Sequence, residues 1–238
     1  MDKPDDFFLR MPMTMDELRA SVEHMVRDQH QVLAAPERDR AIDMALARYG
    51  VDMPRRASAT LRWQADGHAQ RLPQQWQLSF ELLHVELLGA GGRNEALHRY
   101  LVRELADGFE LLLHERKLLA GSQVFIIYIC PHEAGSILPS HREAVAAYAA
   151  HLLCRQLAAH FSGEREAAIG ADASQTESRA RNYAARAAEW RASYFAALGV
   201  ADPAIEGAPA RPAAAVASWP QRHPRHQIGG APAFRGRA

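Results

Sequence analysis

The chain has 238 residues, enough for one sizeable core or for a core with an extended arm. Its 28 Lys and Arg residues balance 28 Asp and Glu residues, and a net charge of zero argues against general nucleic-acid binding by the whole chain. The sequence contains no apolar run long enough to predict a transmembrane helix. Its N-terminus lacks the basic and apolar stretches of a signal peptide. We therefore expect a protein that is intracellular when made and has no membrane partner.

The first fifty residues predict an arm followed by two helices. Residues 1–13 are interpreted as a mobile or docking N-terminal arm. Thr14 and Glu17 form a capping box that starts a helix, whose apolar side extends to Val32-Leu33. With the helix that follows, this segment predicts an antiparallel helical hairpin over about residues 14–50.

A β region is predicted next, over about residues 55–131. Alternation in Ala57–Ala65, followed by the turn dipeptide Asp66-Gly67, predicts a β-hairpin. Gln77–Leu88 fits either a helical or a strand period, but the glycine run behind it favours a strand and a tight turn. Val124–Cys130 is the strongest strand, because it is β-branched and aromatic throughout. We expect roughly four antiparallel strands, inserted between two helical pairs.

Residues 139–198 predict a second and longer antiparallel hairpin of helices. Capping boxes mark the two helix starts, Ser140 with Glu143 and Ser174 with Glu177. Both helices carry apolar stripes at helical spacing. The first stripe consists of Val145, Tyr148, Ala149, Leu152, Leu153, Leu157 and Phe161, and the second of Ala180, Tyr183, Ala184, Ala187, Trp190, Tyr194 and Leu198. The aromatic residues Tyr148, Tyr183, Trp190 and Tyr194 are interpreted as core or subunit interface.

Residues 200–238 are rich in Pro and Arg, and this composition predicts an extended tail with no core of its own. The basic tail could contact nucleic-acid phosphates weakly, or it could be an anchor that orders on a partner. Interleaved Pro and aromatic residues favour the anchor. The candidate anchor residues are Arg211, Trp219, Arg222, Arg225, Ile228, Phe234 and Arg235.

No residue pattern predicts catalysis, a cofactor or a metal site. The twelve histidines form no metal-ligand motif, the glycine run lacks a phosphate-binding pattern, and no serine lies in a nucleophile elbow. Cys130 and Cys154 are predicted to be buried thiols. We therefore expect a protein that is not an enzyme.

These patterns predict an α+β fold that is mainly α. It consists of two antiparallel helical hairpins, a small inserted antiparallel β region and an extended C-terminal tail. The expected divisions are the arm at residues 1–13, a main domain at 14–199 and the tail at 200–238.

Four blocks of sequence carry a resemblance to a known family. They are A-L-A-R-Y-G-V-D-M-P-R-R (45–56), V-F-I-I-Y-I-C-P-H (124–132), the Ala-rich block from L-P-S-H-R-E to A-I-G-A-D (138–172) and R-A-R-N-Y-A-A-R-A-A-E-W-R-A-S-Y (179–194). On these residues the chain resembles the head-to-tail connector (adaptor) proteins of tailed bacteriophages and prophages. The segment from Gln77 to Lys117 and the long tail depart from the family pattern.

The resemblance implies a structural protein of the virion neck, made in the host cytoplasm, with residues 14–199 as the connector domain. Such proteins form a ring, usually of twelve subunits, under the portal, joining the DNA-filled head to the tail and extending the DNA channel. The implied partners are further copies, the portal protein, the next neck or tail protein (a stopper or tail terminator), and DNA that passes through the lumen without sequence-specific binding. The alternative is a helical DNA-binding or regulatory module that uses the basic tail.

Overall fold

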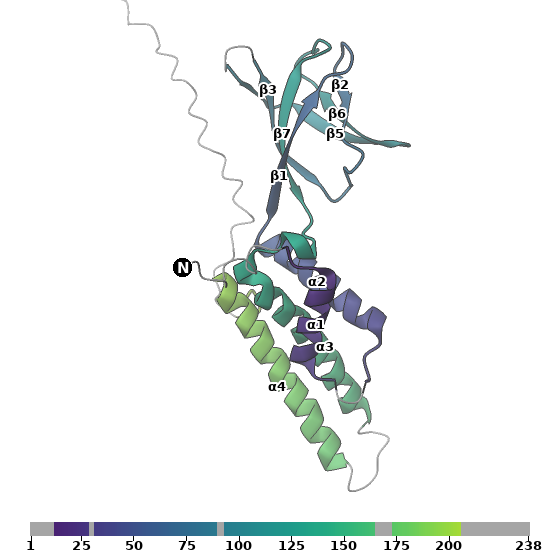
Figure 1. Cartoon of the computed structure of the whole chain (residues 1–238), viewed down its shortest axis with the longest axis vertical. Coiled ribbons are helices and arrows are strands. Elements are labelled where there is room, and N and C mark those ends of the chain that lie inside the picture. Colours follow the sequence, from purple (N-terminus) through teal and green to yellow (C-terminus); the bar gives the residue numbers. More distant parts are fainter. Residues whose placement is uncertain (1–11, 29–30, 90–92, 165–172, 206–238) are drawn as a thin grey trace, which may run out of the picture. The chain divides into compact units, whose positions relative to one another are not determined.

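The computed structural model describes residues 12–28, 31–89, 93–164 and 173–205 (Figure 1). The chain divides into two compact units after Val200, and every element named below belongs to the first of them. Helices alternate with antiparallel sheets along this unit, which gives the predicted α+β fold. Among the described residues, no helix combines the length and the hydropathy that crossing a membrane requires.

The described residues contain four α-helices, α1 (Met15–Val26), α2 (Ala35–Asp52), α3 (Arg142–Glu164) and α4 (Ala173–Leu198). The central helix is α3, against which α1, α2 and α4 each pack (Figure 1). Its apolar spacing explains this position, because Val145, Ala149, Leu153 and Leu157 recur on one face and are all buried.

Both ends of α1 have a clear local cause. The predicted capping box is confirmed: the Glu17 N–H donates to Thr14 Oγ1 at 3.2 Å, and the Thr14 N–H donates to Glu17 Oε2 at 2.8 Å. The helix then stops at Val26, because Arg27 adopts a left-handed conformation with φ 51°. The prediction that it extends to Val32-Leu33 is wrong, although Leu33 is buried beside the core.

The start of α3 differs from the prediction, whereas the end of α4 agrees with it. Ser140 does not cap α3, because it lies inside a 3₁₀ turn, η5 (Pro139–His141), and the helix begins after that turn. Gly199 ends α4 with φ +64°. Its N–H donates to the carbonyl of Ala196, and the Val200 N–H donates to that of Phe195, which is a Schellman arrangement.

In the described residues of the β region, seven strands form two antiparallel sheets, where the sequence predicted roughly four. The first sheet has the order β1 (Arg55–Arg62), β7 (Gln123–Cys130), β3 (Glu81–Leu88) and β4 (Glu95–Leu97). The second has the order β2 (Ala69–Arg71), β6 (Gly108–Leu113) and β5 (Tyr100–Leu105). Both β2 and β4 are only three residues long, too short for a periodic pattern to identify.

The predicted hairpin at Asp66-Gly67 is wrong. β1 does not pair with the segment after this turn but with β7, from Arg55 opposite Cys130 to Arg62 opposite Gln123. The turn instead leads the chain toward β2 of the second sheet, and Gly67 itself forms an isolated bridge with Leu118. A turn dipeptide predicts a reversal of the chain, but it does not determine which strand becomes the partner.

The helices and the sheets bury separate hydrophobic clusters. The helical cluster includes Tyr49, Leu153 and Leu157, and the sheet cluster includes Trp63 and Ile126. Each region therefore has apolar burial of its own to stabilise it.

The two cysteines are free and buried, as predicted. Cys130 ends β7, and Cys154 lies fully buried in α3. Burial raises the pKa of the Cys154 thiol to about 11, so this residue remains a neutral apolar side chain at physiological pH.

Candidate interaction surfaces

Two of the four aromatic residues predicted as core or interface are buried within the chain itself. Tyr194 is fully buried, and Tyr183 is buried and stacks on Phe161 with ring centroids 5.6 Å apart. Tyr148 and Trp190 are half-buried and pack against the helical core. The helical core therefore accommodates more of the aromatic side chains than the sequence pattern suggested.

A buried polar network joins α2 to α4. The Tyr194 hydroxyl donates to Asp52 Oδ2 at 2.8 Å. Arg48 donates to the same carboxylate from Nε at 2.7 Å and from Nη2 at 2.9 Å, while its guanidinium lies 5.3 Å from the centroid of the Phe195 ring. Burial, reinforced by the bond to Asp52, raises the pKa of Tyr194 well above its usual value. This network holds α2 and α4 together.

The chain enters and leaves the β region through a second polar cluster. His132 Nε2 lies 2.8 Å from the carbonyl oxygen of Met53, and its Nδ1 lies 3.0 Å from Ser136 Oγ. The ring of His132 also packs on that of Tyr49, with centroids 4.5 Å apart. Burial lowers the pKa of His132, which favours the neutral ring. These contacts tie the end of α2 to the segment that follows β7.

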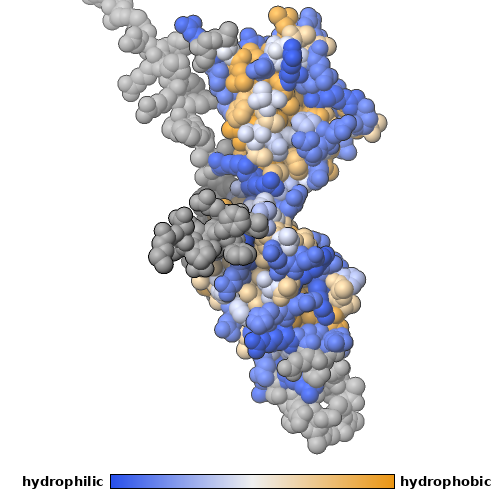
Figure 2. All heavy atoms as spheres, in the orientation of Figure 1, coloured by the Kyte–Doolittle hydropathy of each residue, from blue (hydrophilic) through white to orange (hydrophobic). Residues whose placement is uncertain are grey.

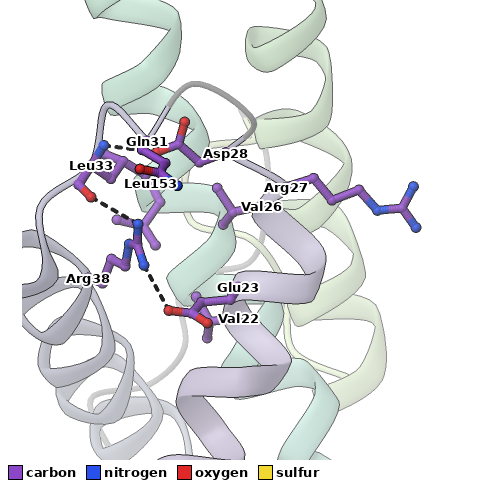
Figure 3. Close-up of a pocket in the computed structure, with 9 residues that line it drawn as sticks. All are labelled: Val22, Glu23, Val26, Arg27, Asp28, Gln31, Leu33, Arg38 and Leu153. Atoms are coloured by element: carbon purple, nitrogen blue, oxygen red, sulfur yellow. Dashed lines mark hydrogen bonds and ion pairs between the residues drawn. The ribbon is translucent and has the colours of Figure 1, made fainter.

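A cavity of about 340 Å³ lies between the end of α1 and the start of α2 (Figure 3). Across it, Arg38 donates to Glu23 at 2.8 Å and to the Leu33 carbonyl at 3.0 Å, whereas Arg27 points away. The Leu33 N–H in turn donates to Asp28 Oδ2 at 2.9 Å. These hydrogen bonds link the end of α1 to the start of α2 across the cavity.

A second hollow, of about 500 Å³, has several arginines in its lining. They are Arg27, which follows α1, and Arg179 and Arg186 of α4, and Glu189 is the carboxylate among the lining residues. The guanidinium of Arg186 donates to the Met25 carbonyl and lies over the Tyr183 ring. Sequence reasoning missed this basic hollow, because its residues are distant in the chain and share no motif.

Helices α2 and α4 each expose a row of apolar side chains. On α2, Met44 is 50% exposed and Val51 is 68% exposed, with exposed Ala47 between them at helical spacing. On α4, the exposed residues include a row of alanines, Ala184, Ala188, Ala192 and Ala196. The prediction that Ala184 belongs to the buried stripe is wrong, because Tyr183 and Ala187 turn the neighbouring face toward the core. We call these surfaces the α2 face and the α4 face.

The β region also exposes apolar side chains. Figure 2 shows hydrophobic areas interspersed with hydrophilic ones on the face of this region that the view presents. The large exposed residues are Leu78, Leu101 and Leu119.

The predicted tail anchors lie outside the described residues. This holds for Arg211, Trp219, Arg222, Arg225, Ile228, Phe234 and Arg235. In the part of the chain that the structure describes, no three His, Cys, Asp or Glu side chains are grouped to hold a metal ion.

Comparison with solved structures gives a structural likeness over part of the chain. No protein-family model and no curated protein matches the chain. Among solved structures, a chain from the neck of an empty GTA particle, a structure computed with C6 symmetry, is 16% identical. The match covers 56% of this chain and 74% of that chain, with a TM-score of 0.29. At that TM-score the likeness carries no inference about the function of this chain.

Proposed function

We propose that the chain is a structural subunit of a phage neck, forming a ring under the portal that joins the DNA-filled head to the tail and extends the DNA channel. The observation that carries this proposal is the presence of two exposed faces on different helices, the α2 face and the α4 face. A ring requires such a pair, because each subunit must offer one surface to the subunit before it and another to the subunit after it.

The chemistry of the two faces suits packing of one helix on another. The alanines of the α4 face let a neighbouring backbone approach closely, and the larger side chains of Met44 and Val51 project from the α2 face. We infer that the α2 face of one subunit packs on the α4 face of the next. The resemblance of the sequence to phage connectors supports a twelve-subunit ring in the virion neck.

The same proposal assigns the partners. The tail at residues 200–238 docks on the portal, the far side of the ring receives a stopper or tail terminator, and DNA passes through the lumen without sequence-specific binding. The role is structural rather than enzymatic, and the protein is made in the host cytoplasm before assembly.

Mass measurement in solution tests the ring and its interface together. The purified chain, mixed with the portal encoded beside it, should join the portal in one fixed stoichiometry. Met44→Asp combined with Val51→Asp should weaken ring formation at least about tenfold, because two desolvated carboxylates would face the alanines. The matched control is Leu119→Asp, which places a charge at an equally exposed apolar site of the β region.

Two outcomes would contradict the proposal. Unchanged assembly of the Met44 and Val51 variant would remove the α2 face from the interface. No association with the portal, together with tight and salt-sensitive DNA binding by the purified chain, would favour the DNA-binding alternative.

Removing residues 200–238 should abolish portal binding while the helices stay folded. The tail supplies the proposed anchors, whereas the helical core is buried within the first unit. Pull-down with the portal measures binding, and circular dichroism of the truncated chain measures helix content. A truncated chain that binds the portal as well as the full chain does would eliminate the tail as the anchor.

A further inference from the structure

The first sheet carries an apolar row on the face that points away from its core. Alternate residues of β7, Val124 and Ile126 among them, are buried in the sheet cluster. Because successive side chains of a strand point to opposite faces, Phe125, Ile127 and Ile129 lie on the other face, which we call the outer face. All three are half-buried, and none belongs to a hydrophobic cluster of the described residues. This apolar row is therefore a candidate contact surface.

Opposite charges flank the apolar row on the two neighbouring strands. The register places Arg56 of β1 and Glu81 of β3 on either side of Ile129. Arg62 lies further along β1, and Glu86 lies further along β3, both on the same face. Residues that pair directly across neighbouring strands share a face of the sheet. The outer face is therefore basic along β1, apolar along β7 and acidic along β3.

This pattern of charge is complementary to itself under one twofold rotation. If the rotation axis runs parallel to β7, the basic strand β1 of each copy lies over the acidic strand β3 of the other. Arg56 of one copy then lies opposite Glu81 of the second copy, and the apolar rows meet at the centre. An axis across the strands would instead place β1 over β1 and β3 over β3, so that like charges face each other. Charge complementarity therefore favours a second copy of this chain in a single orientation.

We propose that two copies of the chain pair through the outer faces of their first sheets, about a twofold axis parallel to β7. The strands of the two sheets then run in nearly the same direction, which is a preferred way for sheets to pack face to face. The apolar rows form the centre of the contact, and the charges of β1 and β3 form its rim. This dimer is a state of the free chain and is independent of the proposed ring, which uses the α2 face and the α4 face.

Sedimentation of the full chain over a range of concentrations tests the contact. The mean mass should rise with concentration from that of one chain toward that of two. Arg56→Glu and Glu81→Arg each make like charges face across the contact, so either variant alone should raise the dimer dissociation constant at least about tenfold. An equimolar mixture of the two variants should dimerise as the unchanged chain does, because each altered charge then faces its opposite.

The matched control is Glu104→Arg, which reverses an exposed charge on β5 of the second sheet and should leave the dimer unchanged. Restored pairing in the mixture also shows that both charge variants are folded. Repeating the measurement in the Met44→Asp, Val51→Asp background separates the sheet contact from the proposed ring, since the dimer should persist when the α2 face is disrupted.

Four results would overturn the proposal. The first is a chain that stays monomeric at every concentration. The second is a dimer that neither charge variant weakens, because such a dimer uses another surface. The third is a mixture of the two variants that pairs no better than either alone, which excludes the proposed axis. The fourth is loss of the dimer in the background with the disrupted α2 face, which would assign the contact to the helices.

Discussion

Asp52→Ala should lower the free energy of unfolding of the helical part by about 3 kcal/mol, because it breaks a buried charged network. The carboxylate is 3% exposed, and its removal leaves the Arg48 guanidinium, 27% exposed, without this counter-charge. It also removes the acceptor of the Tyr194 hydroxyl on α4. Urea denaturation followed by ellipticity at 222 nm measures the change.

The matched control is Asp16→Ala, which breaks the ion pair of Asp16 with Arg19 at the surface of α1. Water already screens that pair, so the expected change is below about 0.5 kcal/mol. Equal effects of Asp16→Ala and Asp52→Ala would mean that the buried network contributes no more than a surface ion pair does.

The same network makes stability depend on alkaline pH. Burial raises the pKa of Tyr194 in the folded state, so the folded chain holds this proton more tightly than the unfolded chain does. The contribution of this proton to folding stability is fully present below about pH 10, which is the pKa of tyrosine in an unfolded chain. It is lost as the pH rises above that value. Tyr194→Phe should therefore cost about 1 kcal/mol at pH 8 and should weaken the decline in stability above pH 10.

The sequence could predict the helix faces and helix caps, because these depend on residues that are close together in the chain. The spacing of Val145, Leu153 and Leu157 identified the buried face of α3, and Thr14 and Gly199 identified helix ends through caps that involve residues within five positions. These features depend on local sequence, so the tertiary structure altered only details such as the ends of helices. At the start of α3, for example, a 3₁₀ turn replaces the expected cap.

Contacts between distant residues were beyond the reach of the same reasoning. Pairing of β1 with β7 joins segments separated by most of the β region, and no local pattern names that partner. The bond between Asp52 and Tyr194, and the hollow shared by Arg27 and Arg186, depend on how the helices pack. The α4 face could likewise be identified only after the core was filled, since Ala184 belongs to the apolar stripe that the sequence shows for its helix.

Because the helices and the sheets bury separate clusters, a core substitution should destabilise one region and spare the other. Ile126→Ala in β7 and Leu157→Ala in α3 each remove a fully buried side chain and should cost about 3 kcal/mol. Ile126→Ala should speed amide exchange of β7 on the order of a hundredfold and leave α3 unchanged, and Leu157→Ala should do the reverse.

Amide exchange followed by mass spectrometry, peptide by peptide, separates the two regions within one experiment. Leu119→Ala is the control, because this side chain is 67% exposed and its loss should change stability by less than about 0.5 kcal/mol. If either core variant speeds exchange equally in β7 and α3, the two regions unfold as one cooperative unit. Separate responses would instead mean that the β region can open while the helices that carry the α2 and α4 faces stay folded.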